Sequence, residues 1–430
     1  MNVLRKMIGP ALKRPAAWFL AALVAIIAVP MLPAAAEPPP AQSQPQAGAT
    51  DAERAARDLL SGAQAKLAFN LIEKVASGPA QQATVSPASL ASVLDLVSIG
   101  ADAKMKASLA KTLGFADRSD AGFAALDDAR SKLAAGGDAF AFADKIVFAP
   151  SNPPSKFMLA GLKEYKVPVE VADLSNADEA AKIDAWVKDV TKGAIPEILG
   201  GPVSKASFAA LNALHFKSRW KNPFDPKLTA AAAFTGLDGK SADVQMMHLT
   251  KATRAFRQEK VGEKAGERTF VAVDLPFADE RFSLVVVTTK EKLAAPKDFG
   301  PVAAWLSGAG FKLQAGDLAL PRFAASGREE LLPALDALGL RDARRSPTAL
   351  QGFGPDVTLS QVTQRATIEV DEEGAEAAAA TVDIGTRTLE VDDSIHMVVD
   401  RPFVYALRDK TTGMILIAGY VGQQPKGKTA

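Results

Sequence analysis

The chain has 430 residues, of which 48% are hydrophobic and 23% are charged, as expected of a globular protein with a sizeable core. Its 50 basic and 49 acidic residues leave a net charge of +1, which provides no field that would favour nucleic acid or an anionic membrane as a partner. The chain contains no cysteine, which excludes disulfides, thiol catalysis and cysteine metal sites.

Residues 1–36 have the pattern of a signal peptide. Basic side chains precede the apolar run 16–29, and the small residues 34–36 that follow suit signal peptidase. We therefore predict a secreted protein, extracellular or periplasmic. The alternative is an N-terminal membrane anchor, but the apolar run is shorter than the ~20 residues that cross a bilayer. Residues 37–55, rich in Pro, Ala and Gln, are predicted to form a linker.

The first half of the mature chain is mainly helical by pattern. Apolar residues at helical spacing begin near Asp51 and continue to Val75. Ser86 and Pro87 begin a second helix, because serine caps helices and proline fits the first turn. Next along the chain, the pattern predicts a helix, a strand and a helix at residues 104–113, 140–148 and 180–191. The apolar run 208–216 fits a buried strand or a buried helix equally well.

The second half consists mainly of predicted strands, at residues 271–277, 282–287, 318–323, 357–370, 396–399, 403–407 and 414–421. Residues 328–338 are predicted to form a helix that stops at Gly339. Because helices and strands are largely segregated along the chain, the pattern indicates an α+β fold.

Enzymatic chemistry has little support in this sequence. A hydrolytic triad needs a histidine beside a nucleophile, and only His215, His248 and His396 are available. Nucleophile-elbow, zinc-protease, phosphate-loop and dinucleotide motifs are missing. The acidic cluster at 371–376 lacks the alternating ligands of a calcium loop. We predict that the protein is not an enzyme and has no catalytic residues, metal site or cofactor.

Five motifs in order along the chain resemble those of the serpin family of serine protease inhibitors. They are VSPASL at 85–90, NALHFKSRW at 212–220, PFDP at 223–226 with MMH at 246–248, EEGAEAAAAT at 372–381, and RPFVY at 401–405 with GMILIAG at 413–419. The resemblance covers residues 56–423 and is to an inhibitory, bacterial-like exported member. It implies one α+β domain with three β-sheets, eight or nine helices and an exposed reactive centre loop. Residues 424–430 are predicted to be a flexible tail.

The resemblance implies a suicide-substrate mechanism. A target protease cuts the exposed loop, and the loop then enters the main sheet and traps the acyl-enzyme, so the uncut protein must be metastable. The hinge would be Glu373, Gly374, Ala375, Glu376, Ala377, Ala378, Ala379, Ala380 and Thr381. Alanines favour helix by propensity, yet as a strand they place small side chains on the face that enters the core. The alternative is a non-inhibitory serpin that acts as a binding or carrier protein.

Two polar clusters follow from the same resemblance. Ser86, Ser89 and Asn212 match the family's shutter, the cluster beneath the opening sheet, and Gln364 occupies the place where a histidine is usual. Glutamine still donates and accepts hydrogen bonds. Trp220, Arg322 and Glu372 match the breach, where insertion starts, and we predict that Arg322 and Glu372 lie within hydrogen-bond reach.

The bond that is cut has two candidates. Counting from Gly374 by the family's spacing gives Thr388–Leu389, whereas Arg387–Thr388 offers a basic side chain to a trypsin-like pocket. Asp383 would point inward after insertion, where an unpaired carboxylate is costly. The predicted partner is a serine protease of the trypsin-like, elastase-like or subtilisin-like class. The inhibitor itself is predicted to be a monomer that is capable of loop–sheet polymerisation.

Overall fold

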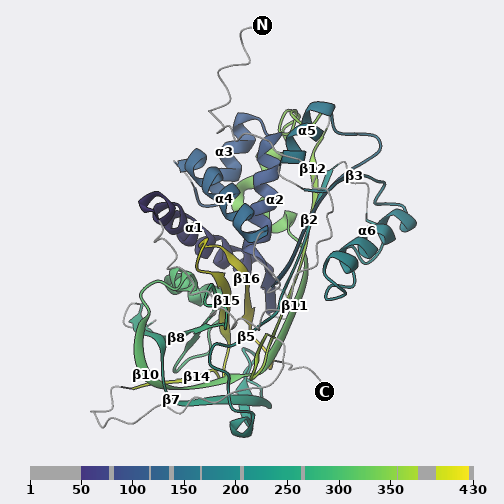
Figure 1. The fold of residues 1–430 in the computed structure, drawn as a ribbon. Coiled ribbons are helices and arrows are strands. Elements are labelled where there is room, and N and C mark those ends of the chain that lie inside the picture. The colour runs from purple at the N-terminus through teal and green to yellow at the C-terminus, as the bar shows by residue number, and fades with distance from the viewer. Residues whose placement is uncertain are drawn as a thin grey trace, which may run out of the picture. The chain divides into compact units, whose positions relative to one another are not determined.

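The computed structural model describes residues 50–76, 82–115, 118–134, 140–164, 167–203, 208–262, 267–355, 357–375 and 394–425. Helices α1 to α4 gather at one end of this part of the chain, and strands extend away from them (Figure 1). The predicted signal peptide, residues 1–36, lies outside the described residues, as does almost all of the predicted reactive centre loop. Within the described ranges, no helix is both long enough and apolar enough to cross a membrane.

The first helices begin at strong caps. Helix α1 (Asp51–Val75) starts from Thr50, whose side chain accepts from the backbone of Glu53 while the Glu53 carboxylate accepts from the backbone of Thr50. Residues 51–55, which the sequence assigned to the linker, are therefore the first turn of α1. Helix α2 (Pro87–Ile99) begins at the predicted Ser86 cap with proline in its first turn.

The other helical segments range from 3 to 16 residues in length. They are α3 (Ala103–Thr112), α4 (Ser119–Ala134), α5 (Lys156–Glu164), α6 (Ala177–Val190), the 3-10 segments η3 (Pro226–Leu228) and η4 (Pro296–Ser307), α7 (Leu332–Leu335), the π-helical η5 (Asp336–Leu340) and α8 (Arg341–Arg344). The helix predicted over 328–338 is wrong in its first part, because residues up to Glu330 pair with a neighbouring strand. The leucine spacing typical of a helix begins only at Leu332.

A five-stranded sheet positions the candidate site. Its order is β11 (Phe323–Glu330), β12 (Leu359–Val370), β4 (Phe208–Phe216), β2 (Phe140–Phe148) and β3 (Val169–Val171). Strand β4 resolves the ambiguity of the run 208–216 in favour of strand. Its side chains alternate between two cores: Leu211 and Ala213 join the core that includes Ile183 and Val187 of α6, whereas Leu214 joins the core that includes α2. The sheet is thus covered on both faces.

A nine-stranded sheet holds most of the second half of the chain. Its order is β1 (Gln82–Val85), β16 (Ile415–Val421), β15 (Phe403–Asp409), β9 (Phe282–Thr289), β8 (Arg268–Pro276), β7 (Ser241–Val261), β10 (Lys312–Pro321) and β14 (Ile395–Val398), with β6 (Ala230–Thr235) pairing β7. A third, two-stranded sheet joins β13 (Gly374–Ala375) to β5 (Ser218–Arg219).

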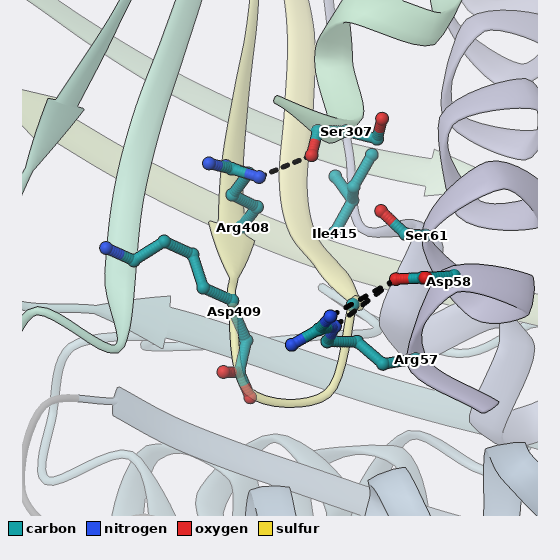
Figure 2. A pocket seen from close by; sticks show the side chains of 9 residues that line it. Arg57, Asp58, Ser61, Ser307, Arg408, Asp409 and Ile415 are labelled. Carbon is teal, nitrogen blue, oxygen red and sulfur yellow. Dashed lines mark hydrogen bonds and ion pairs between the residues drawn. The ribbon is translucent and has the colours of Figure 1, made fainter. Parts of the chain in front are cut away.

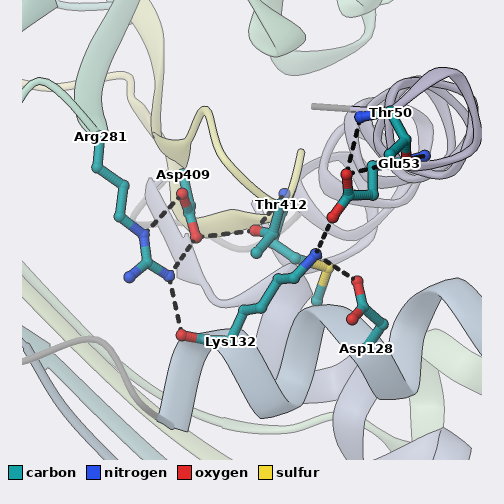
Figure 3. Close-up of polar contacts among 8 residues, drawn as sticks. Thr50, Glu53, Asp128, Lys132, Arg281, Asp409 and Thr412 are labelled. Carbon is teal, nitrogen blue, oxygen red and sulfur yellow. Dashed lines mark hydrogen bonds and ion pairs between the residues drawn. The ribbon is translucent and has the colours of Figure 1, made fainter. Parts of the chain in front are cut away.

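A buried ion pair fixes the turn between β15 and β16 of the nine-stranded sheet. Asp409, fully buried, accepts from Arg281 Nε at 3.0 Å and Nη2 at 2.8 Å, and from the Thr412 hydroxyl at 2.8 Å (Figure 3). Arg281 also donates to the carbonyl of Lys132 near the end of α4. A charge this deeply buried is tolerated because its oxygens are hydrogen-bonded. The turn is thereby attached to the helical layer.

Candidate functional site

The candidate site is the seam between β12 and β4 in the five-stranded sheet. These strands run parallel and pair directly, from Leu359 opposite Phe208 to Thr367 opposite His215. Four residues after β12 ends, the chain reaches Gly374 of the predicted hinge. Their neighbours β11 and β2 pair with them antiparallel, so the seam is the weaker kind of pairing in the middle of the sheet.

Three of the four predicted shutter residues form one cluster. Gln364 Oε1 accepts from the backbone N–H of Ser86 at 2.6 Å, and Gln364 Nε2 donates to the Ser86 carbonyl at 2.7 Å. The Ser86 hydroxyl donates to Ser89 Oγ at 2.6 Å and accepts from the Ser89 backbone. All three side chains are buried. Glutamine thus uses both its donor and its acceptor, and it ties β12 to the first turn of α2.

The fourth residue, Asn212, belongs to a different pair. It lies opposite Gln364 across the seam, but its Nδ2 donates to Oδ1 of Asp144 on β2 at 2.5 Å. Burial raises the pKa of Asp144 to about 7, against smaller lowering effects of the Asn212 hydrogen bond and the Arg130 charge. The predicted shutter is therefore divided between the two sides of the seam.

Sequence reasoning missed Asp144. The signal was present in the strand itself, where alternate residues 140, 142, 144, 146 and 148 read Phe, Phe, Asp, Ile and Phe. Because alternate residues of a strand share one face, this sequence pattern predicts a carboxylate within an otherwise apolar face. Such a residue is a candidate for a perturbed pKa.

The predicted contact between Arg322 and Glu372 is confirmed. Arg322 Nε lies 2.8 Å from both carboxylate oxygens of Glu372, and Nη2 lies 2.7 Å from Oε1. The Thr229 hydroxyl also donates to Glu372. Burial on its own would raise the pKa of Glu372, but the hydrogen bonds from Arg322 and Thr229 together lower it. The carboxylate is therefore held ionised although its side chain is almost fully buried.

Trp220 fixes the chain beside this ion pair. Its backbone N–H donates to the Glu373 carbonyl at 2.8 Å, and its indole Nε1 donates to the Asp371 carbonyl at 2.9 Å. Its ring stacks on Phe277 with centroids 4.4 Å apart. The three predicted breach residues thus meet at the end of β12, where they hold the start of the hinge. We call Trp220, Arg322 and Glu372 the clamp.

Gly374 follows the clamp and has a conformation that requires glycine. Its φ is +147°, and a Cβ atom there would lie 2.2 Å from the carbonyl oxygen of Ser218. It pairs with Arg219 in the two-stranded sheet. The backbone of Ala375 is the last described part of the hinge. Residues 376–381 of the hinge, Asp383 and both candidate bonds, Arg387–Thr388 and Thr388–Leu389, lie outside the described residues.

A polar pocket of about 280 Å³ lies where α1, η4 and the turn between β15 and β16 meet (Figure 2). Its arginines are already engaged within the chain: Arg408 donates to the Ser307 carbonyl and to Asp274, and Arg57 contacts Asp58. The contacts of Arg408 join β15 to η4 and β8, whereas the contact between Arg57 and Asp58 lies within α1. In the described ranges, no cluster of three or more acidic or histidine side chains is arranged to hold a metal ion.

Comparison with known sequences connects this geometry to a family. Residues 62–423 match the family model described as Serpin (serine protease inhibitor). The chain is 29% identical over 346 residues to Serine protease inhibitor 42Dd of Drosophila melanogaster, an alignment covering 77% of this chain and 89% of that protein. It is 28% identical over 380 residues to the leukocyte elastase inhibitor of Bos taurus, covering 84% and 98% of the two chains.

Solved structures show the same fold. The thermophilic serpin tengpin in its native state matches with a TM-score of 0.71 at 21% identity, over 85% of this chain and 94% of that one. Serpin48 of the insect Tenebrio molitor matches with a TM-score of 0.70 at 24% identity, over 88% of this chain and all of that one (100%). The predicted α+β class and serpin fold are thereby confirmed.

Proposed function

Since the chain belongs to the serpin family, we propose that it inhibits a serine-type endopeptidase as a suicide substrate. The protease cleaves the segment after the hinge and forms an acyl-enzyme. The freed segment then inserts between β12 and β4 and carries the protease with it, so that the acyl-enzyme is trapped before it can hydrolyse. Loop insertion of this kind is an established case of strand addition and of release of stored strain.

The observation that carries the proposal is the direction of the strands at the seam. Strands β12 and β4 are parallel neighbours, and the hinge follows β12 in the chain. A segment that folds back from the end of β12 runs antiparallel to β12 and therefore also to β4. Insertion replaces one parallel interface by two antiparallel ones, which have the better hydrogen-bond geometry. The uncut molecule is accordingly proposed to be metastable.

The clamp supports this proposal because it lies where insertion has to begin. Arg322 lies between β10 and β11, and Glu372 directly precedes the hinge, so their ion pair joins the start of β11 to the end of β12 where the hinge begins. A hinge of small residues can pass this point with little steric demand. A carrier protein with a static loop would not need such residues. We therefore favour the inhibitor over the binding-protein alternative.

The finer parts of the proposal concern the target and the compartment. The target is a trypsin-like, elastase-like or subtilisin-like protease, and the cut bond is Thr388–Leu389 or Arg387–Thr388. The apolar run near the N-terminus supports export to the extracellular space or the periplasm. The inhibitor acts as a monomer and needs no cofactor.

The decisive experiment mixes the protein with trypsin, elastase and subtilisin separately. An inhibitor gives an SDS-stable complex with at least one of them, and mass spectrometry of the released C-terminal peptide identifies the bond. A protein cut beyond the hinge is then heated. The inhibitor gains thermal stability on cleavage, whereas cleavage without either a complex or a gain in stability contradicts the proposal.

A further inference from the structure

Buried carboxyl groups lie under the five-stranded sheet, on the α2 side. Asp144 on β2 and Asn212 on β4 are opposite each other in the antiparallel register, and Asn212 retains only 1% of its exposed area. Asn212 Nδ2 donates to Asp144 Oδ1 at 2.5 Å, but Asn212 Oδ1 is buried and accepts no hydrogen bond in the described part of the chain. A buried acceptor without a donor is costly, so this pair is incomplete if Asp144 is an ionised carboxylate.

A proton on Asp144 completes the pair. A carboxylic acid offers one O–H donor besides its carbonyl acceptor, and an amide offers one acceptor besides its N–H donors. The acid can therefore donate to Asn212 Oδ1 while its carbonyl oxygen accepts from Asn212 Nδ2. Both groups are then neutral and both are satisfied, which is the condition under which polar groups are tolerated in a core.

We propose that Asp144 is a positioning residue that carries a proton while the seam is closed and releases it when the seam opens, which makes loop insertion depend on pH. The proposal rests on the inhibitory function proposed above. When the seam parts and β4 shifts over α2, water reaches Asp144 and the ionised carboxylate becomes favourable. Because opening releases a proton, opening becomes easier as the pH rises.

The charged groups that face this region come from three helices. Arg130 on α4 is a cation whose field lowers the pKa of Asp144, although less than burial raises it. Arg130 Nη2 is held by Asp127 on the same helix at 2.9 Å. Asp95 on α2 is a second buried carboxyl, for which burial again raises the pKa to about 7, and Lys106 on α3 acts on Asp95 in the opposite direction. Asp95 is thus the other buried carboxyl that could carry the proton, and the test has to distinguish it from Asp144.

The closed-state proton sets the direction of the pH effect. Burial raises the pKa of Asp144 from its ordinary value of 3.8 to about 7 in the closed sheet. Between these values the closed, folded protein holds a proton that the open or unfolded protein does not. Stability of the closed sheet therefore falls as the pH rises from about 4 to about 7, and the effect levels off above 7.

The test compares the full-length protein with Asp144→Asn and with the matched control Asp95→Asn. Asparagine at 144 can form the same two-way pair with Asn212 at every pH, because an amide supplies both a donor and an acceptor. We expect the wild-type insertion rate to rise with pH between 5 and 7, toward the limit of tenfold per pH unit for one proton. We expect that rise to be lost in Asp144→Asn and kept in Asp95→Asn. Rates are compared at the same pH, so that the protease's own pH dependence cancels.

A second readout does not depend on inhibition. The pH dependence of the melting temperature should flatten in Asp144→Asn, and the infrared absorption of buried protonated carboxyls at pH 5.5 should lose the contribution of Asp144 while that of Asp95 remains. If the chain forms no complex with any protease but shows these two effects, the proposed function fails and the proton assignment stands. If the pH dependence and the full infrared intensity of wild type persist in Asp144→Asn, or are reduced only in Asp95→Asn, the assignment is wrong.

Discussion

The hinge end of the seam and its middle are fastened by opposite chemistry. At the hinge end, the Arg322 guanidinium is partly exposed and ion-pairs with Glu372, whose pKa is lowered. In the middle, Gln364 and Ser86 are buried neutral groups, and the pKa of the neighbouring Asp144 is raised to about 7. An ion pair is thus used at the end of the seam where strand exchange would begin and where the Arg322 side chain reaches water. Neutral hydrogen bonds are used where charge would be costly.

The largest expected effect is at the hinge. Ala375→Arg would require a charged side chain to enter the sheet early in insertion, which costs a few kcal/mol. We expect the variant to be cleaved as a substrate with little stable complex, measured as the number of inhibitor molecules consumed per protease inhibited. Ala378→Arg is the matched control, because strand alternation places residue 378 on the opposite face. Equal complex yields for the two variants would contradict the predicted faces.

The clamp should give the next largest effect. Arg322→Met removes the partner of a buried carboxylate and should lower the free energy of unfolding by about 3 kcal/mol, because the charge remains buried. Urea unfolding measures this loss. Lys240→Met is the control, since Lys240 lies 3.7 Å from Asp238 at an exposed site, and such pairs contribute at most about 1 kcal/mol. Similar losses in both variants would show that the clamp is an ordinary surface pair.

In the middle of the seam, replacing the uncharged side chain of Gln364 should lower the free energy of unfolding by less than the loss of the clamp does. Gln364→Met keeps the length of the side chain but leaves the Ser86 N–H without its acceptor, while the Ser86 carbonyl keeps the backbone N–H of Leu90. We expect a loss of about 2 kcal/mol, together with faster insertion because β12 is released from α2. Gln361→Met is a control on the same strand, where the amide donates to Thr363 of that strand. A wild-type unfolding midpoint for Gln364→Met would rule out the proposed tie.

The smallest expected effect is a difference in how the two ends of the comparison, Glu372 and Asp144, make the free energy of unfolding depend on pH. The pKa of Glu372 is lowered from 4.5 in the folded protein, so its contribution to stability is present above pH 4.5 and is lost as the pH falls below that value. The loss should be smaller than the loss that Arg322→Met itself causes, because protonation leaves a neutral group in the buried site and not an unpaired charge, and it should be missing in Arg322→Met. Asp144 acts in the opposite direction, since its raised pKa makes stability fall as the pH rises toward 7. A free energy of unfolding that only rises or only falls with pH over this range would contradict this contrast.

Much of this arrangement could be predicted because it depends on local pattern and on motifs. The Ser86 cap, the strand at 140–148 and the Arg322–Glu372 contact follow from residue types at recognisable positions. The strand over 323–330 was missed because β11 is held by pairing with β12, and strand propensity at a partly exposed position is weak. Asp144 was missed because its partner Asn212 is 68 residues away in sequence. Its raised pKa comes from burial, which only the folded chain provides.

The central claim is that β12 and β4 must separate for inhibition, and the absence of cysteine makes a direct test clean. Ala209 and Gln361 are paired across the seam, and neighbouring strands are close enough for a disulfide. Ala209→Cys/Gln361→Cys should form an SDS-stable protease complex when reduced and be cleaved without a complex when oxidised. The control Ala324→Cys/Glu369→Cys joins β11 to β12, and it should inhibit in both states. Full complex formation by the oxidised seam variant would contradict the account.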